Sequence, residues 1–164
     1  MPEFAGEPRG AGRRIVVVAS RFNESVTTPL CEGAVETLVN NGVAFDDIDV
    51  LWVPGAWELP IAVRRAVGSA RYDAAVAVGA VIRGETPHFD FVAGESARGL
   101  MEVSREFDVP VTLGLLTTDT LAQAEARAGG AHGNKGADAA LAALELLDLF
   151  DRAVPLDEED AELH

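Results

Sequence analysis

The 164-residue sequence is poor in several residue types, and each scarcity excludes a class of protein. Cys31 is the only cysteine, which excludes an internal disulfide bond and a cluster of thiolate metal ligands. No apolar run approaches the roughly 20 residues that a helix needs to cross a bilayer, so no membrane association is expected. The first residues lack the apolar segment of a signal peptide, and we therefore expect a cytoplasmic protein.

Positive charge is scarce as well. Thirteen basic residues face 27 acidic ones, which gives a net charge of −14, and Lys135 is the single lysine. Such a surface repels phosphate backbones, so a nucleic-acid partner is not expected. We predict an acidic, solvated C-terminal tail over residues 153–164 and a flexible N-terminal leader over residues 1–13. Residues 14–152 would then form a single domain.

What the sequence does contain is an alternation of short β-branched runs with amphipathic helical periods. The runs are apolar without a period of two, which is typical of strands buried on both faces. They lie at residues 15–19, 50–53, 74–78 and 109–113. Helical periods lie within residues 26–38, 59–67, 89–107, 120–128 and 134–150. This order predicts a doubly wound, flavodoxin-like α/β domain, with a four-stranded parallel sheet and helices on both faces.

Ligands of such a sheet bind beyond the carboxyl ends of its strands, so the loops after the runs should carry the function. These predicted loops are residues 20–23, 54–58, 79–88 and 115–119. All four contain residue types that are unusual for plain connections.

The loop of residues 79–88 carries the most chemistry. Thr86 before Pro87 is predicted to cap a helix, whose free N–H groups would bind an anion that Gly84 lets approach closely. His88 would then lie in the first helical turn beside that anion, where an imidazole can move protons near pH 7. The alternative is an ordinary capped helix with an incidental surface histidine.

Two other loops offer flat apolar surfaces. Phe22 directly follows a strand and could stack on a planar heterocycle, or its ring could pack back over the core. Trp57 stands beside Glu58, a carboxylate that can accept hydrogen bonds from hydroxyl groups. A hydrophobic staple with an acid in the first helical turn explains this pair equally well.

Arg127 and Lys135 flank a glycine-rich segment, residues 129–133, in an otherwise acidic protein. Two cations in this setting suggest a phosphate-bearing ligand, although Arg127 could simply complement a helix dipole. No spacing of histidines and carboxylates indicates a metal, and no dinucleotide, Walker or nucleophilic-serine motif is present. The residues therefore predict a phosphorylated substrate, a planar stacking partner and one histidine, with no metal or cofactor.

Several segments, taken in order, resemble the lumazine synthase family across roughly residues 14–150. The resemblance is carried by residues 20–23, 53–60, 79–90, 114–120 and 134–136, among which 79–90 is the most specific. Trp57 and Leu113 depart from the pattern, since phenylalanine is frequent at both positions.

The resemblance implies a transferase of riboflavin biosynthesis that needs no metal or organic cofactor. It would condense 5-amino-6-(D-ribitylamino)uracil with 3,4-dihydroxy-2-butanone 4-phosphate to 6,7-dimethyl-8-ribityllumazine, releasing phosphate and water. His88 would be the general acid/base. Substrate would be bound by Phe22, Ala56, Trp57, Glu58, Ala80, Val81, Ile82 and Leu113. Phosphate would be bound by Glu85, Thr86 and Arg127, with Lys135 as an accessory cation.

The resemblance also implies a homo-pentamer, assembled into a closed shell of twelve rings, with riboflavin synthase as a candidate partner. Each site would be split between subunits, so that Leu113, Arg127 and Lys135 of one complete the cleft of its neighbour. Pro8 and the net charge oppose a shell, by weakening an added N-terminal strand and by repulsion between rings.

Two other hypotheses stay open: a non-catalytic flavin- or lumazine-binding protein, and a shell-forming protein without activity. The presence of Thr86 and Arg127 argues against the first, because a ligand without phosphate would not need them. The presence of His88 argues against the second.

Overall fold

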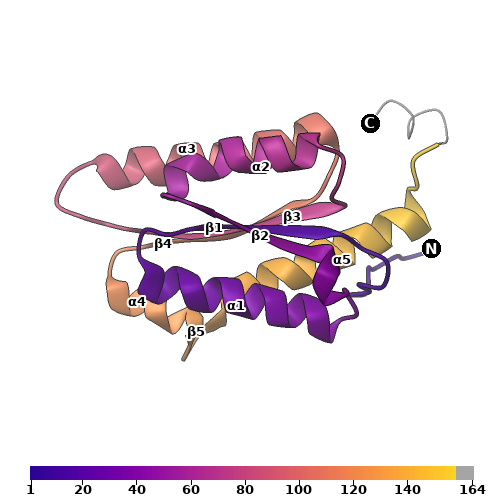
Figure 1. Ribbon diagram of the computed structural model, residues 1–164, viewed down its shortest axis with the longest axis horizontal. Coiled ribbons are helices and arrows are strands. Elements are labelled where there is room, and N and C mark those ends of the chain that lie inside the picture. Colours follow the sequence, from indigo (N-terminus) through magenta and orange to yellow (C-terminus); the bar gives the residue numbers. More distant parts are fainter. Residues whose placement is uncertain (158–164) are drawn as a thin grey trace.

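A four-stranded parallel sheet forms the centre of the molecule, with helices on both faces (Figure 1). The computed structural model describes residues 1–157, so most of the predicted acidic tail, residues 158–164, lies outside the described residues. The strands are β1 (Ile15–Ser20), β2 (Ile48–Val53), β3 (Ala74–Ile82) and β4 (Val111–Thr118), in the order β2-β1-β3-β4. The predicted doubly wound, flavodoxin-like α/β architecture is confirmed.

The two central strands explain the unbroken apolar runs in the sequence. Every residue of β1 is buried, because successive side chains point to opposite faces and both faces are covered. Val17 packs into the core on the side of α1 (Glu24–Asn40) and α5 (Lys135–Ala153), and Val18 packs into the core beneath α2 (Leu59–Gly68) and α3 (His88–Phe107). Figure 1 shows α2 and α3 above the sheet and α1 and α5 below it, together with the short α4 (Leu121–Ala126).

Helices α1 and α5 approach so closely at Gly136 that no side chain would fit at this position. A Cβ added to Gly136 would lie 2.0 Å from the carbonyl oxygen of Leu30. Asn134 closes the contact, since its Oδ1 accepts from the Ala137 N–H at 3.0 Å and its Nδ2 donates to the Pro29 carbonyl at 2.9 Å. One side chain therefore caps α5 and fastens it to α1.

The strands extend further than the sequence pattern predicted. We expected the connection after the third run to begin at Gly79 and the one after the fourth at Leu115, but β3 continues to Ile82 and β4 to Thr118. Their pairing, up to Ile82 beside Thr118, stabilises both extensions. The glycine-rich segment is also more ordered than a plain linker, because β5 (Ala128–Gly130) and β6 (Gly133–Asn134) pair as an antiparallel hairpin. Two 3-10 helices, η1 (Phe45–Asp47) and η2 (Ala56–Glu58), complete the described elements.

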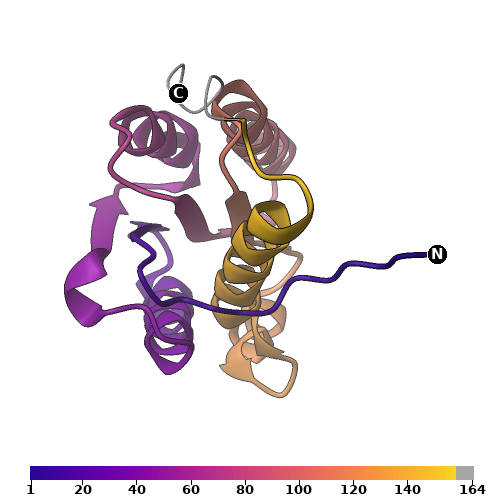
Figure 2. The ribbon, with the colours of Figure 1, turned by 90° about the vertical axis from the view of Figure 1, so that its right-hand side faces the viewer.

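The first 13 residues cross α5 in an extended conformation, as Figure 2 shows. The Glu7 N–H donates to Asp148 Oδ2 at 2.8 Å, and Arg13 pairs with Asp151 at 2.5 Å. The hydrogen bond from the Glu7 backbone, aided by Arg152, lowers the pKa of the Asp148 carboxyl. This carboxyl is therefore charged at neutral pH and holds the start of the chain against α5.

Candidate active site

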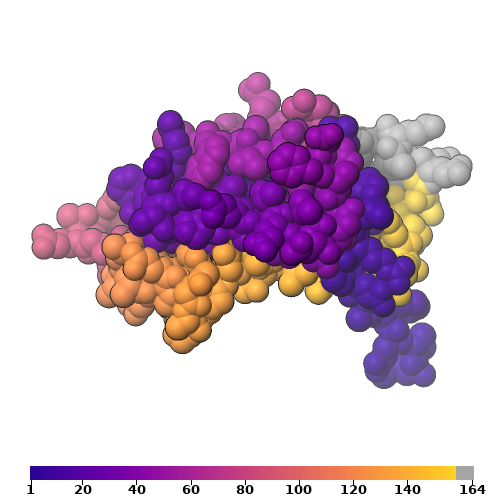
Figure 3. Space-filling view, turned by 60° about the horizontal axis from the view of Figure 1, so that its bottom comes forward, coloured from indigo at the N-terminus to yellow at the C-terminus, as the bar shows by residue number. Residues whose placement is uncertain are grey.

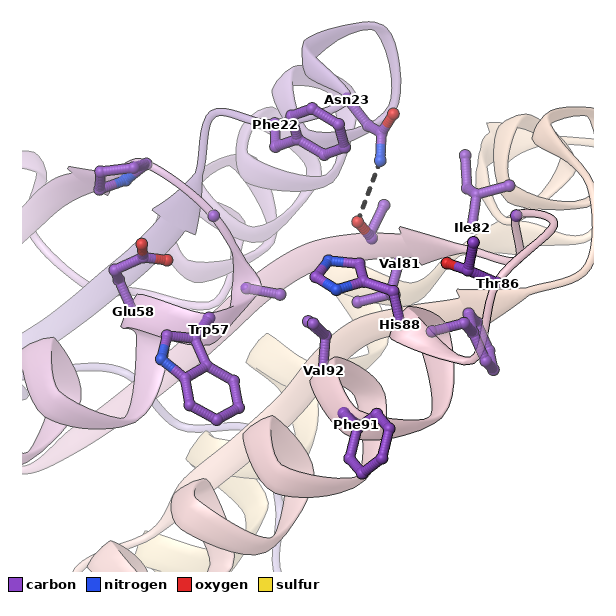
Figure 4. Close-up of a pocket in the computed structure, with 16 residues that line it drawn as sticks. Phe22, Asn23, Trp57, Glu58, Val81, Ile82, Thr86, His88, Phe91 and Val92 are labelled. Carbon is purple, nitrogen blue, oxygen red and sulfur yellow. Dashed lines mark hydrogen bonds between the residues drawn. The ribbon is translucent and has the colours of Figure 1, made fainter.

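A hollow of about 720 Å³ opens at the carboxyl ends of β1 and β3, where the strand order reverses. This is the place at which open α/β sheets bind their ligands. Figure 4 shows His88 in the middle of the hollow, with Phe22 across from it, Trp57 and Glu58 toward one end, and Thr86 and Ile82 toward the other. Residues from three of the four predicted loops therefore meet in one cavity. The fourth loop, residues 115–119, lines a second hollow instead.

Phe22 is presented by a short extension of the β1–β2 pairing. The Arg21 N–H donates to the Val53 carbonyl at 2.8 Å, and the Phe22 N–H donates to the Pro54 carbonyl at 3.0 Å. Asn23 then adopts a left-handed conformation, with φ of 66°, and its Nδ2 donates to the Ala80 carbonyl at 3.1 Å. The ring of Phe22 is left 71% exposed, so it is free to stack and does not pack back over the core.

The opposite wall is built by η2. Ala56 is buried, and the Ser96 hydroxyl, from α3, donates to its carbonyl at 2.9 Å. This bond holds η2 against α3, and Trp57 on the same turn is left 58% exposed. Glu58 precedes α2 without forming a side-chain cap. Glu58 is the acid in the first turn of η2, as the alternative interpretation expected, and both Trp57 and Glu58 also line the hollow.

The end of β3 supplies backbone groups to the floor. β3 pairs with β1 only as far as Val78, whereas it pairs with β4 as far as Ile82. Beyond Val78, the edge of β3 that faces the hollow has no neighbouring strand, and Ala80, Val81 and Ile82 line the cavity there. The Ala80 carbonyl accepts from Asn23, and the remaining N–H and C=O groups on such an edge can bind the polar edge of a flat ring.

The connection from β3 to α3 differs from the prediction at its cap. The helix begins at His88, and Pro87, not Thr86, precedes it, without a side-chain cap hydrogen bond. No side chain therefore competes with an anion for the N–H groups at the start of this helix. Thr86 and Gly84 line the hollow, whereas exposed Glu85 does not. Figure 3 shows this part of the chain, in pink, projecting from one end of the molecule.

The three remaining predicted residues lie outside this hollow within one chain. Arg127 lines a second hollow of about 380 Å³, together with Arg83, Thr118 and Asp119. Leu113 is a half-exposed residue of edge strand β4, in register with Ala77. Lys135 lies beside Arg127, since its N–H donates to the Arg127 carbonyl at 2.9 Å. Within one chain, the backbones of Arg127 and Lys135 are therefore in contact, and neither residue lines the hollow of His88.

Three residues near the site carry no role in the sequence reasoning. Asn23 ties the loop of Phe22 to β3, and its tolerance of a left-handed conformation was the available signal. Phe91 lines the hollow three residues after His88, a spacing that places both on one helix face. Arg83 pairs with Asp119 across the ends of two strands, and this hydrogen bond raises the pKa of the Arg83 guanidinium. No sequence pattern indicated that pairing.

Residues 1–157 contain no group of three or more histidine, cysteine or acidic side chains arranged to hold a metal ion. None of their helices combines the length and apolarity required to cross a membrane.

Comparison with known proteins shows the family of the chain. The family model described as 6,7-dimethyl-8-ribityllumazine synthase matches residues 12–151. The chain belongs to the 6,7-dimethyl-8-ribityllumazine synthase family. It is 82% identical over 160 residues to a 6,7-dimethyl-8-ribityllumazine synthase of Gemmatimonas aurantiaca, and the aligned residues cover 98% of each chain. The match to this lumazine synthase family model includes every residue of both hollows.

Proposed function

We propose that the protein is a 6,7-dimethyl-8-ribityllumazine synthase, acting in riboflavin biosynthesis. It condenses 5-amino-6-(D-ribitylamino)uracil with 3,4-dihydroxy-2-butanone 4-phosphate, and it releases phosphate and water. The observation that carries the proposal is the meeting of Phe22, the edge of β3 and His88 in one hollow of about 720 Å³. The pyrimidine needs an aromatic ring to stack on, backbone groups that bind its polar edge, and a side chain that transfers protons, and these three features supply them.

The pyrimidine stacks on Phe22 and forms hydrogen bonds with the backbone of residues 80–82. Its ribityl chain lies along η2, where Glu58 accepts hydrogen bonds from the hydroxyl groups. The primary amine of the pyrimidine attacks the ketone carbonyl and water leaves, which forms an imine. Phosphate is then eliminated, and ring closure with loss of a second water gives the lumazine. His88 transfers protons in these steps, and the protein accelerates them further by holding both reactants together.

The phosphate lies at the open N-terminus of α3, near Thr86, and one arginine completes its binding. Arg127 of the same chain lines a different hollow, so the arginine comes from a neighbouring subunit, along with Leu113 and the accessory Lys135. Leu113 is 45% exposed on an edge strand, which suits a residue that a neighbour covers. A homo-pentamer, assembled into a 60-mer, supplies this arrangement, because a ring closes a heterologous interface on itself. A cytoplasmic location and an association with riboflavin synthase belong to the same proposal.

The test is to mix the purified protein with both substrates and to follow phosphate release together with lumazine absorbance. We expect phosphate and lumazine to appear in equal amounts, and no phosphate above the uncatalysed rate when the pyrimidine is omitted. A protein that binds lumazine but releases no phosphate would be a binding protein, which would contradict the proposal. A large assembly without turnover would instead indicate a shell protein that has lost its activity.

A further inference from the structure

Arg83 follows the last residue of β3 and contacts three groups around the turn that carries His88. Its Nε donates to Asp119 Oδ1 at 2.8 Å, just beyond the end of β4. One of its terminal nitrogens lies 3.4 Å from Asp90 Oδ1, and the guanidinium lies 4.3 Å above the centre of the Phe89 ring. Phe89 and Asp90 are the two residues that follow His88, so Arg83 links the sheet to the first turn of α3.

Besides these contacts and the packing of half-buried Phe89 against the core, few interactions hold the connection between β3 and α3. At its start the Arg83 N–H donates to the Thr118 carbonyl at 2.8 Å, and at its end the Asp90 N–H donates to the Pro87 carbonyl at 3.1 Å. The helix has no side-chain cap, and a Cβ placed on Gly84 would meet no atom within 4 Å. The direction in which the His88 imidazole extends therefore depends on how the first turn is fixed to the sheet.

We propose that Arg83 is a positioning residue, which orients His88 for proton transfer by fastening the first turn of α3 to the end of β4. The inference rests on the proposed function, in which His88 is the group that moves protons. Each contact of Arg83 is weak on its own, because the side chain is about half exposed. All three share one planar guanidinium, so ordering a single side chain serves the whole set.

Direct binding of the substrate phosphate by Arg83 fits the contacts less well. Arg83 lines the second hollow together with Arg127, which would place two guanidinium groups near an anion. However, the Asp119 and Asp90 carboxylates already occupy two of its donor directions, and both repel a phosphate. Arg127 instead donates to the Gln123 carbonyl and pairs with no carboxylate among residues 1–157.

Arg64 offers a matched control. It pairs with Glu106 at 2.8 Å and lies 5.5 Å above the Phe107 ring, near the other end of α3 and away from the hollow. Arg83→Met and Arg64→Met thus remove similar contacts from the two ends of one helix while keeping the apolar stem. We expect Arg83→Met to lower kcat about 10- to 100-fold, since a displacement of about 1 Å costs rates of that order. KM for the phosphorylated ketone should change little, and Arg64→Met should leave both constants unchanged.

A double-mutant cycle separates positioning from general support of the fold. In a His88→Ala background, Arg83→Met should lower kcat by less than about twofold, because the group on which it acts is gone. Asp119→Ala removes the acceptor of the shortest contact and should act in the same direction as Arg83→Met. An equal loss in both backgrounds, or a raised KM for the ketone with unchanged kcat, would overturn the positioning role.

Hydrogen–deuterium exchange of the unliganded protein tests the same inference without any activity. The peptide covering residues 84–92 should exchange faster in Arg83→Met than in the parent, and at the parent rate in Arg64→Met. Unchanged exchange in Arg83→Met would overturn the inference. If the parent protein releases no phosphate from the two substrates, the proposed function fails, and the exchange result alone then decides whether Arg83 orders this turn.

Discussion

At the scale of single residues, His88 and Arg127 have different proposed roles, which are proton transfer for His88 and phosphate binding for Arg127. His88 is exposed at the start of α3 and lines the larger hollow, and Arg127 lines the smaller one. Neither side chain is part of the apolar core. Replacing either one should therefore change catalysis or binding without changing the fold.

His88→Ala should lower turnover about 10- to 1000-fold, which is the range for loss of a proton-transferring group. The fold should persist, because an exposed residue in the first helical turn supports no core packing. Turnover is measured with both substrates saturating. His132→Ala is the matched control, since this exposed histidine lies in the β5–β6 hairpin. Unchanged turnover of His88→Ala would contradict an acid/base role.

Arg127→Ala should raise KM for the phosphorylated ketone far more than KM for the pyrimidine. A lost charge-assisted contact to phosphate corresponds to about 1.5–3 kcal/mol, or roughly 10- to 150-fold. Inorganic phosphate should compete with the ketone in the parent and inhibit the variant poorly. Arg105→Ala, an exposed arginine in the last turn of α3, should change neither constant. Equal damage to both substrates would assign Arg127 a structural role instead.

Cys31 should resist thiol reagents while the protein is folded. Burial, followed by the charge of Glu32, raises the pKa of its thiol to about 11. At pH 8 only about one thiol in a thousand is then ionised, and the thiolate is the reactive form. Labelling with an aromatic disulfide reagent should be slow in buffer and fast after unfolding in guanidinium. Fast labelling of the folded protein would show that the α1–α5 layer opens readily.

At the scale of elements, close packing of helices decides which small residues are replaceable. The contact between α1 and α5 has no room for a Cβ at Gly136, whereas a Cβ at Gly94, on α3, would meet no atom within 4 Å. The two glycines are therefore opposite cases, although a helix-propensity scale treats them alike.

Gly136→Ala should lower the free energy of unfolding by about 1–3 kcal/mol, because the added methyl group forces the two helices apart. Gly94→Ala should instead raise it by about 0.5–1 kcal/mol, since alanine reduces the backbone entropy lost on folding. Urea unfolding at equal protein concentration measures both, and equal concentration removes any contribution from association. Equal effects of the two changes would mean that α1 can move away from α5 at no cost.

At the scale of the whole molecule, the proposed site is complete only in an assembly. Light scattering on a sizing column should give about 87 kDa for a ring of five chains of 17.3 kDa and about 1 MDa for a closed shell of sixty. We expect the shell, and we expect it to loosen toward rings as salt is lowered, because the charge of −14 per chain repels across ring contacts. A fully active monomer would contradict both the assembly and the shared site.

Much of the architecture could be read from local pattern. The unbroken apolar runs predicted buried parallel strands, and the switch-point rule then predicted that the loops of Phe22, Trp57 and His88 would meet. The prediction that Thr86 caps α3 was wrong. The pair Thr86-Pro87 fits a cap followed by a first helical residue, but the helix begins one residue later, at His88. The extension of β3 to Ile82 was missed, since it depends on pairing with residues of β4 some 36 positions along the chain.

The sequence by itself determined the fold class, the residue types of the site and the family, because periodicity and motif spacing are local properties. Only the tertiary structure decided that β3 extends beyond β1, so that the end of β3 has no neighbouring strand on that side, and that Asn23 donates to the Ala80 carbonyl. It also decided that Arg83 pairs with Asp119 and that Arg127 and His88 line different hollows of one chain. These are distances between segments remote in sequence, and they follow from how the helices and strands pack, which no single segment encodes.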